Sequence, residues 1–417
     1  MVRADGSESS LRIPGEVTVP GRLSRALSPV DGLFAYLSTS YPPPGDESSP
    51  TLTLNVVSLL GRGSDFSTPL ASSAIESDDV FPSEIERAMT ESESLAWSPE
   101  GRRLAFIGAQ DGPSADLYEY YRDSDKVVRL TDGPSQAYSP LWSPDGRWIV
   151  HSAAKSFGTG AGFSVAGIYA ARADGSGAFS LYDTSADSAS DEAIGWLDDH
   201  TVVTVSYFPS NGSSDLRLVD LSVQKADLVI RSPLGAVAVG GGSVLFEKWP
   251  NRDDSDEDPI EGTFILTASD RTPRLIGDYG IYITGWEEGI GAFLAQTVDS
   301  KILEISPAGE IRILPVDGSH LPVVSPGGRY WAYTEWFGKN SEEGVFVAEY
   351  GKEPARIFEG GISSTDMLFS TTGDALYFLT ETGKLYGAQA PEWTPYLLAS
   401  GFMRRQFGIP IAWMEGE

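Results

Sequence analysis

Short apolar runs, rich in β-branched and aromatic residues, alternate along the chain with tight turns of Ser, Pro, Asp and Gly. Residues 140–153, PLWSPDGRWIVHSA, show the pattern most clearly, with one run that ends at Trp142 and another that begins at Trp148. Pro144 fixes φ at the first central position of a turn and Gly146 accepts a positive φ, so this segment predicts two antiparallel strands joined by a turn. We expect both tryptophans to pack between neighbouring sheets.

The same strand and turn pattern recurs at a fixed spacing. Turns of this kind begin at Ser98 and Ser143, which are 45 residues apart, and again at Ser325 and Ser370, at the same interval. Four further copies, one with an inserted residue and three with degenerate turns, lie at residues 26–38, 194–208, 236–249 and 282–297. A third and a fourth apolar run follow the pair, as in residues 167–184. Such a period indicates an array of small supersecondary units.

Eight units of four strands predict an all-β fold, an eight-bladed β-propeller of four-stranded antiparallel sheets. Radial stacking of the sheets covers faces and edges that a lone sheet leaves exposed. A seven-bladed propeller is the alternative, because strand boundaries taken from one sequence err by several residues. We expect residues 1–417 to form a single domain, closed by strand pairing between residues 15–19 and 408–414. An insertion between the first and second blades, residues 71–94, is expected to hold a short helix that starts near Ser83.

Three sequence features together resemble the TolB-type, or WD40-like (PD40), β-propeller repeat. They are the Ser-Pro-Asp-Gly turn after Trp142, the third-strand segment GIYAARADGSG at residues 167–177, and the fourth-strand segment KVVRLTDG at residues 126–133. The resemblance is most specific over residues 95–184 and covers nearly the whole chain as architecture. It implies repeated residues that shape blades and carries no catalytic residue. Because TolB-type proteins act through partners, it also implies a binding function.

Composition narrows the classes of partner and compartment. A formal net charge of −29 argues against nucleic acid, because phosphate binding needs a basic surface. No apolar run approaches the length that spans a bilayer, and the absence of cysteine excludes disulfides and thiolate chemistry. Residues 1–16 lack the apolar segment of a leader. We expect an extracytoplasmic protein, periplasmic or exported, whose leader is absent from this chain, with a cytoplasmic location as the alternative.

The connections between the second and third strands of several units are long. Four of them span residues 38–50, 153–167, 248–262 and 335–344. Long loops cost ordering entropy and often mount binding residues on a rigid scaffold. We predict that aromatic residues of these loops contact a partner, namely Tyr41, Phe157, Phe163, Trp249, Trp336 and Phe337.

One of these loops carries an acidic run that is a candidate calcium site. It contains Asp253, Asp254, Asp256, Glu257 and Asp258. Closely spaced carboxylates supply the oxygen ligands that calcium prefers, although the run lacks the glycine and distal glutamate of an EF-hand loop. A solvated loop is the alternative interpretation, and no other cofactor is expected.

Catalytic motifs are absent from the sequence. The chain contains no HExxH, Walker or GxSxG motif. The three histidines are scattered, with His151 expected just after a strand, and we interpret His151, His200 and His320 as structural or surface residues. The sequence therefore favours a non-catalytic binding or scaffold propeller of the bacterial cell envelope that holds a protein, peptide or glycan partner. The alternative is an enzyme-associated propeller, either the gating domain of a peptidase or a lyase-type propeller.

Overall fold

The computed structural model describes most of residues 25–400. The gaps are residues 30–32, 41–50, 59–64, 72–83, 91–93, 112–113, 134, 159–161, 183–189, 250–260, 278–280, 300, 318–321, 336–343, 361, 363–366, 371 and 381. Contacts between Cα atoms divide the chain into two compact units. Among the described residues, unit 1 comprises those of residues 234–400 and unit 2 those of residues 25–233.

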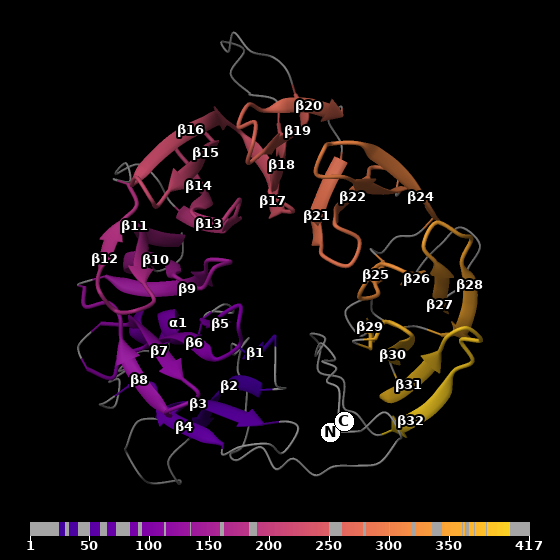
Figure 1. The fold of residues 1–417 in the computed structure, drawn as a ribbon, viewed down its shortest axis with the longest axis horizontal. Coiled ribbons are helices and arrows are strands. Elements are labelled where there is room, and N and C mark those ends of the chain that lie inside the picture. The colour runs from indigo at the N-terminus through magenta and orange to yellow at the C-terminus, as the bar shows by residue number, and fades with distance from the viewer. Residues whose placement is uncertain are drawn as a thin grey trace. The chain divides into compact units, whose positions relative to one another are not determined.

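Unit 2 contains four four-stranded antiparallel sheets, and the strands of each sheet follow one another in chain order (Figure 1). Its strands are β1 (Arg25–Leu27), β2 (Leu33–Ser40), β3 (Thr51–Ser58), β4 (Phe66–Pro69), β5 (Leu95–Trp97), β6 (Arg103–Gly108), β7 (Asp116–Tyr121), β8 (Lys126–Arg129), β9 (Gln136–Trp142), β10 (Trp148–Gly158), β11 (Gly162–Arg172), β12 (Ala178–Ser180), β13 (Ser190–Trp196), β14 (Thr201–Phe208), β15 (Ser213–Asp220) and β16 (Lys225–Ser232). The first strands of the four sheets lie along one side of the unit, and the fourth strands lie along the opposite side (Figure 1).

Unit 1 repeats this arrangement with four more four-stranded antiparallel sheets. Its strands are β17 (Leu234–Gly240), β18 (Ser243–Lys248), β19 (Gly262–Thr267), β20 (Arg274–Gly277), β21 (Ile281–Glu287), β22 (Ala292–Thr297), β23 (Lys301–Ile305), β24 (Ile311–Asp317), β25 (Val323–Val324), β26 (Tyr330–Glu335), β27 (Gly344–Glu349), β28 (Ala355–Glu359), β29 (Met367–Phe369), β30 (Ala375–Leu379), β31 (Lys384–Gln389) and β32 (Tyr396–Ser400).

The described residues thus form eight sheets, and the prediction of an eight-bladed β-propeller is confirmed. The seven-bladed alternative is wrong. The segments expected to close the fold, residues 15–19 and 408–414, lie outside the described residues. The single domain of residues 1–417 stays a prediction.

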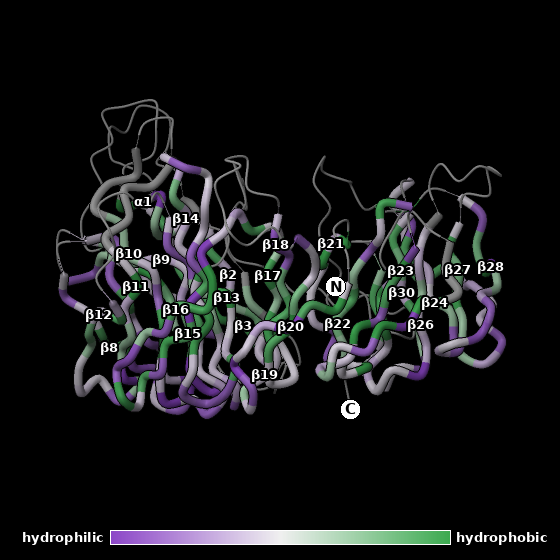
Figure 2. The backbone as a smooth tube through the Cα atoms, turned by 90° about the horizontal axis from the view of Figure 1, so that it is seen from above, coloured by the Kyte–Doolittle hydropathy of each residue, from purple (hydrophilic) through white to green (hydrophobic). Residues whose placement is uncertain are grey.

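A short helix, α1 (Glu84–Thr90), lies within the insertion between the first and second sheets, as predicted. Figure 2 shows α1 at the upper end of unit 2. Its residues Ala88 and Met89 are fully buried in a cluster that also contains Phe106 of β6 and Ala137 of β9. The insertion therefore adds apolar contacts to the second and third blades.

Apolar packing between neighbouring sheets forms the cores of both units. All residues of β18, the second strand of the fifth sheet, are buried. In the fourth strand of the fourth sheet, β16, only Ser232 is buried and the other residues are exposed or partly buried, as expected at an edge. In unit 1, Leu294 of the sixth sheet packs in one cluster with Trp331 and Phe346 of the seventh. Burial of such side chains contributes roughly 1.5 to 3 kcal/mol each.

Residues 153–167 are not the loop that the sequence predicted. Strands β10 and β11 continue through this segment and pair from Trp148 opposite Arg172 to Gly158 opposite Gly162, with register shifts around Ala154. The glycines and serines in this stretch are typical of loops. Where these residues pair across the extended hairpin, strand pairing satisfies their backbone N–H and C=O groups. Phe157 and Phe163 are therefore opposite each other in the sheet, one residue pair before the described pairing ends at Gly158 and Gly162, and their contact with a partner stays a prediction.

Candidate functional site

The Ser-Pro-Asp-Gly turn of the third blade has the predicted geometry and one further contact. Gly146 has φ of 67°, and the Arg147 backbone N–H donates to Oδ1 of Asp145 over 3.0 Å. Oγ of Ser143 also accepts hydrogen bonds from the backbone N–H groups of Arg147, at 3.2 Å, and Trp148, at 2.9 Å. The same bond, from the N–H five residues later to the serine Oγ, recurs at Ser98, Ser325 and Ser370. The repeated serine is therefore a structural residue.

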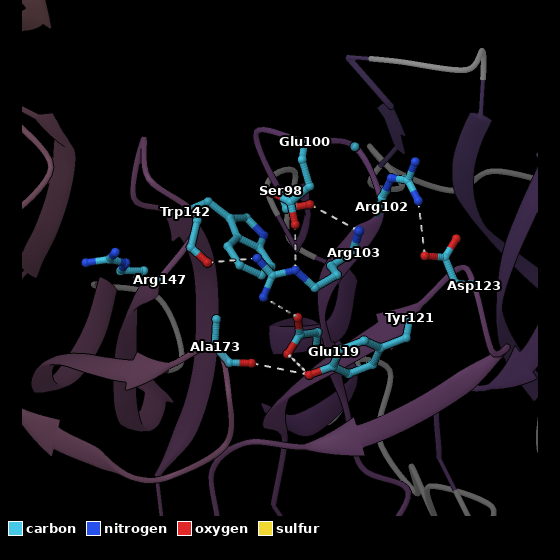
Figure 3. A network of polar contacts seen from close by, with 12 residues as sticks. Ser98, Glu100, Arg102, Arg103, Glu119, Tyr121, Asp123, Trp142, Arg147 and Ala173 are labelled. Carbon is cyan, nitrogen blue, oxygen red and sulfur yellow. Dashed lines mark hydrogen bonds and ion pairs between the residues drawn. The ribbon is translucent and has the colours of Figure 1, made fainter.

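Arg103 of β6 links the second blade to the third at this turn (Figure 3). Its Nη2 donates to the Gly146 carbonyl oxygen over 2.8 Å, and its guanidinium carbon lies 4.7 Å from the ring centroid of Trp142. Its Nε also donates to Oε1 of Glu100 over 2.6 Å. One cation thus contacts a carboxylate, a carbonyl and an aromatic ring.

Glu119 of β7 is fully buried beneath Arg103 (Figure 3). Its Oε1 lies 3.3 Å from Nη1 of Arg103, and the Tyr121 hydroxyl lies 2.9 Å from its Oε2 and 3.3 Å from the Ala173 carbonyl oxygen. Burial raises the pKa of Glu119, while Tyr121 and Arg103 act in the opposite direction. Burial and the hydrogen bond to Glu119 raise the pKa of Tyr121 to about 12. The polar atoms of Arg103, Glu119 and Tyr121 thus bond to other residues of the same chain, and we interpret these three residues as structural.

The other end of the blades carries the connections in which we predicted binding residues. Trp249 follows β18 directly, and 43% of its surface is exposed. Tyr41, Trp336 and Phe337 lie outside the described residues, as do the acidic residues of the candidate calcium site. These positions remain predictions. Among the described residues, no group of three or more His, Asp or Glu side chains is placed to hold a metal ion.

The surroundings of Trp249 depend on a glycine. Gly235, near the start of β17, leaves a space into which the Trp249 indole and the Glu247 carboxylate both reach. A Cβ at Gly235 would lie 2.7 Å from the indole Nε1 and even closer to Glu247 Oε2. Because β17 begins and β18 ends at the same end of an antiparallel sheet, the three residues share one end of the fifth blade. An exposed indole beside a buried carboxylate is suited to contact a cationic or donor-rich partner.

A pocket that the sequence analysis missed lies between the second and third blades of unit 2. Its volume is about 450 Å³. It is lined by Asp116, Leu130, Thr131, Asp132, Gly133, Ser135, Ala137, His151, Ala153, Tyr169, Ala178, Phe179 and Ser180. The start of β7, the end of β8 and the start of β9 all contribute residues, so the pocket is near the end of the blades that carries the long connections.

His151 lies inside β10, so its predicted place after a strand is wrong. Only 3% of the residue is exposed, and its ring stacks on Tyr169 of β11 with centroids 5.8 Å apart. Nδ1 is 3.1 Å from the Ser152 carbonyl oxygen, which can only accept, so Nδ1 carries the proton. Nε2 has no hydrogen-bond partner in the part of the chain that the structure describes. Burial lowers the pKa of His151 to about 4, and the ring is neutral at pH 7. In the sequence, the only indication of this buried histidine is its place directly after the apolar residues Trp148, Ile149 and Val150.

Two aspartates and one arginine set the charge beside His151. Asp116 is buried and accepts hydrogen bonds from Arg129 Nη2 at 2.6 Å and from Thr131 Oγ1 at 3.0 Å. The same Arg129 nitrogen lies 2.9 Å from Oδ1 of Asp132, whose side chain is 85% exposed. Two carboxylates thus face one guanidinium, which leaves this side of the pocket with a net negative charge.

No helix in the described part of the chain has the length and apolar character needed to cross a membrane.

Comparisons with known proteins support the fold more than the function. No model of a known protein family matches the chain. A stretch of 54 residues is 46% identical to the uncharacterized peptidase YuxL of Bacillus subtilis, which is 13% of this chain and 8% of that protein. The chain therefore spans far less than two thirds of this relative.

Solved structures that are similar to the chain include the β-propeller domain of the Trilobed protease from Pyrococcus furiosus, with a TM-score of 0.40 and 13% identity, over 80% of this chain and 95% of that one. Dipeptidyl peptidase 4 of Porphyromonas gingivalis matches with a TM-score of 0.52 and 12% identity, over 91% of this chain and 59% of that one. TolB from Acinetobacter baumannii matches with a TM-score of 0.30 and 14% identity, over 67% of this chain and 75% of that one. At these identities the likeness concerns the fold alone. With its eight four-stranded antiparallel sheets, the chain has the fold of an eight-bladed β-propeller, and its repeated Ser-Pro-Asp-Gly turns resemble the TolB-type repeat.

Proposed function

We propose that the chain is a non-catalytic binding propeller of the cell envelope that holds a protein, peptide or glycan partner at the long-connection end of its blades. The observation that carries this proposal is Trp249, an indole exposed over 43% of its surface beside the buried Glu247. Tryptophan is enriched among residues that dominate the energy of interfaces. The opposite end of the blades, which carries the Ser-Pro-Asp-Gly turns, supports the proposal by contrast. There the turn serines, Arg103 and Glu119 bond to other residues of the chain and hold the blades together.

The location and the remaining contact residues belong to the same proposal. Trp336 and Phe337 are proposed as further contact residues of unit 1 and Tyr41 as a contact residue of unit 2, and the acidic run from Asp253 to Asp258 is proposed to add charge or bind calcium. An extracytoplasmic location agrees with a chain that contains no cysteine.

Capture of partners from an envelope extract tests the proposal with a matched pair of variants. Trp249→Ala is compared with Tyr396→Ala, because Tyr396 is 41% exposed in the same unit but lies at the start of β32, after a turn between third and fourth strands. We expect Trp249→Ala to lose about 2 kcal/mol of binding, roughly 30-fold in affinity, with an unchanged melting temperature. Loss of the same partner in Tyr396→Ala, or retention in both variants, contradicts the proposal.

A second candidate function is that of a propeller that accompanies a peptidase domain. The local identity of 46% to the peptidase YuxL favours it. In that case the propeller would bind a peptidase domain rather than an envelope component. Co-purification of a serine hydrolase that reacts with a fluorophosphonate probe would support this second function, whereas an unreactive captured partner would contradict it.

A further inference from the structure

The His151 pocket has the size and the mixed lining of a small-ligand site. Its volume of about 450 Å³ falls within the usual range of ligand pockets, roughly 300 to 1,000 Å³. Leu130, Ala153 and Phe179 give it apolar walls, while His151 and Asp132 add polar groups. An apolar wall with a few polar groups fits a ligand that has an aliphatic stem and a polar tip.

His151 determines which polar tip would fit. Because Nδ1 donates to the Ser152 carbonyl, Nε2 presents a lone pair and can only accept a hydrogen bond. A buried acceptor without a partner costs about 1 to 3 kcal/mol, and a donor supplied by a ligand would remove that cost. The missing group is therefore an N–H or O–H donor.

The charges near the pocket favour a cation over a neutral hydroxyl. Asp116 and Asp132 share the single guanidinium of Arg129, so one negative charge is left over. The Tyr169 ring, stacked on His151, adds an aromatic face that attracts a cation. A single accepting nitrogen suits a compact ammonium better than the planar fork of a guanidinium.

We propose that this pocket binds a primary ammonium group on an aliphatic chain, as found in a lysine side chain or in a free diamine. The ammonium is attracted by Asp132 and donates to Nε2 of His151, which a shift of the side chains around it must first expose because this atom is buried, and its methylene groups pack against Leu130 and Phe179. The pocket belongs to unit 2 and Trp249 to unit 1, so either can be disabled while the other is kept.

Titration calorimetry with matched probes tests the ligand chemistry. The probes are Nα-acetyl-lysine methylamide, which keeps the side-chain ammonium, its norleucine counterpart, Nα-acetyl-arginine methylamide, 1,5-diaminopentane and a neutral disaccharide. We expect the lysine probe to bind at least tenfold more tightly than the norleucine probe and more tightly than the arginine probe. Tighter binding of the diamine than of the lysine probe identifies a free amine as the source, and the reverse identifies a peptide. Equal binding of lysine and norleucine probes, preference for the disaccharide, or no binding at millimolar concentration overturns the proposal.

Variants locate the binding. His151→Phe keeps an aromatic ring against Tyr169 but removes Nε2, and we expect it to lose lysine binding at least tenfold while it stays folded. Asp132→Asn should weaken binding several-fold, whereas Asp123→Asn is the control, since Asp123 is also exposed and paired with an arginine but lies in the turn after β7. Unchanged binding in His151→Phe, or an equal effect of the two Asp→Asn changes, overturns the proposal.

Nitrogen NMR supplies a readout that does not depend on stability. The chain has three histidines, so selective labelling gives few ring signals. Addition of the lysine probe should shift the Nε2 signal that disappears in His151→Phe. A shift confined to the other histidines overturns the proposal.

Discussion

The indole Nε1–H of Trp142 donates a hydrogen bond to the backbone carbonyl oxygen of Ala96 over 2.9 Å, and so joins the third blade to the second. The equivalent tryptophan one repeat earlier, Trp97, donates in the same way to Ala26 of the first blade over 3.1 Å. Each tryptophan stands just before the serine of its turn. The repeat thus encodes a contact between blades as well as a turn within a blade.

Replacement of Trp142 by phenylalanine tests this contact between blades. The ring remains but the N–H is lost, so we expect a loss of about 1 to 2 kcal/mol in the free energy of unfolding. Trp142→Ala should cost about 3 to 5 kcal/mol, because it also leaves a cavity. Urea unfolding measures both values, and Trp97→Phe serves as the matched variant. Equal stability of wild type and Trp142→Phe would show that the bond contributes nothing.

Glycine replacement in two turns separates backbone strain from crowding. Gly146 and Gly175 have φ of 67° and 72°, so alanine at either position is strained by about 1 to 2 kcal/mol. A Cβ at Gly146 would also lie 3.1 Å from both Arg103 Nη2 and Glu100 Oε2, whereas at Gly175 the nearest atom is 3.8 Å away. We therefore expect Gly146→Ala to lower the melting temperature more than Gly175→Ala. The opposite order would contradict the crowding argument.

The pair of Arg103 and Glu119 should respond unequally to the loss of either partner. Arg103→Met leaves the buried Glu119 without its cation, and we expect a loss of about 3 to 5 kcal/mol in stability. Glu119→Gln keeps a neutral acceptor for Tyr121 and should cost less. The double variant should lose less stability than the two single variants lose together, because it no longer contains the unpaired carboxylate of Glu119. Additive effects in a double-mutant cycle would show that the two side chains act independently.

Acidification should destabilise the protein through His151. Burial lowers the pKa of this residue to about 4 in the folded protein, from an unfolded value of 6.5. Below pH 6.5 the unfolded chain binds a proton that the folded chain does not, so this contribution is present above pH 6.5 and is lost as the pH falls towards 4. Between pH 7 and pH 5 the loss is about 2 kcal/mol.

The measurement compares urea unfolding of the wild type and of His151→Phe at these two pH values. The variant lacks the titrating group, so its stability should fall by about 2 kcal/mol less than that of the wild type. An identical fall in the two proteins would show that the pKa of His151 does not differ between the folded and the unfolded protein.

The sequence predicted the blades well because their information is local. Pro144 and Gly146 specify the turn through their own φ values, and the spacing of the apolar runs specifies the strands around them. The same local reasoning failed to predict the strands in residues 153–167, since the glycines between Phe157 and Phe163 and the serines on either side are typical of a loop, and the pairing of β10 with β11 is visible only in three dimensions.

The pocket could not be predicted because its parts come from separate strands of two blades. Asp116 and His151 are 35 positions apart in the sequence, and neither belongs to a recognisable motif. The predicted contact residue Trp249 could be found from its place after an apolar strand, but its dependence on Gly235 could not. Contacts between elements that are distant in sequence follow from packing, which a pattern along one chain does not encode.

Helix α1 has a consequence for the dynamics of unit 2. It places Ala88 and Met89 in the core shared by the second and third blades at one end, while Arg103 and Trp142 join the same blades at the other. Two attachments at opposite ends leave no hinge about which one blade can open alone. The backbone amides of β6 and β10 should therefore exchange with deuterium as one cooperative unit, and those of the edge strands β8 and β12 should exchange earlier by local fraying.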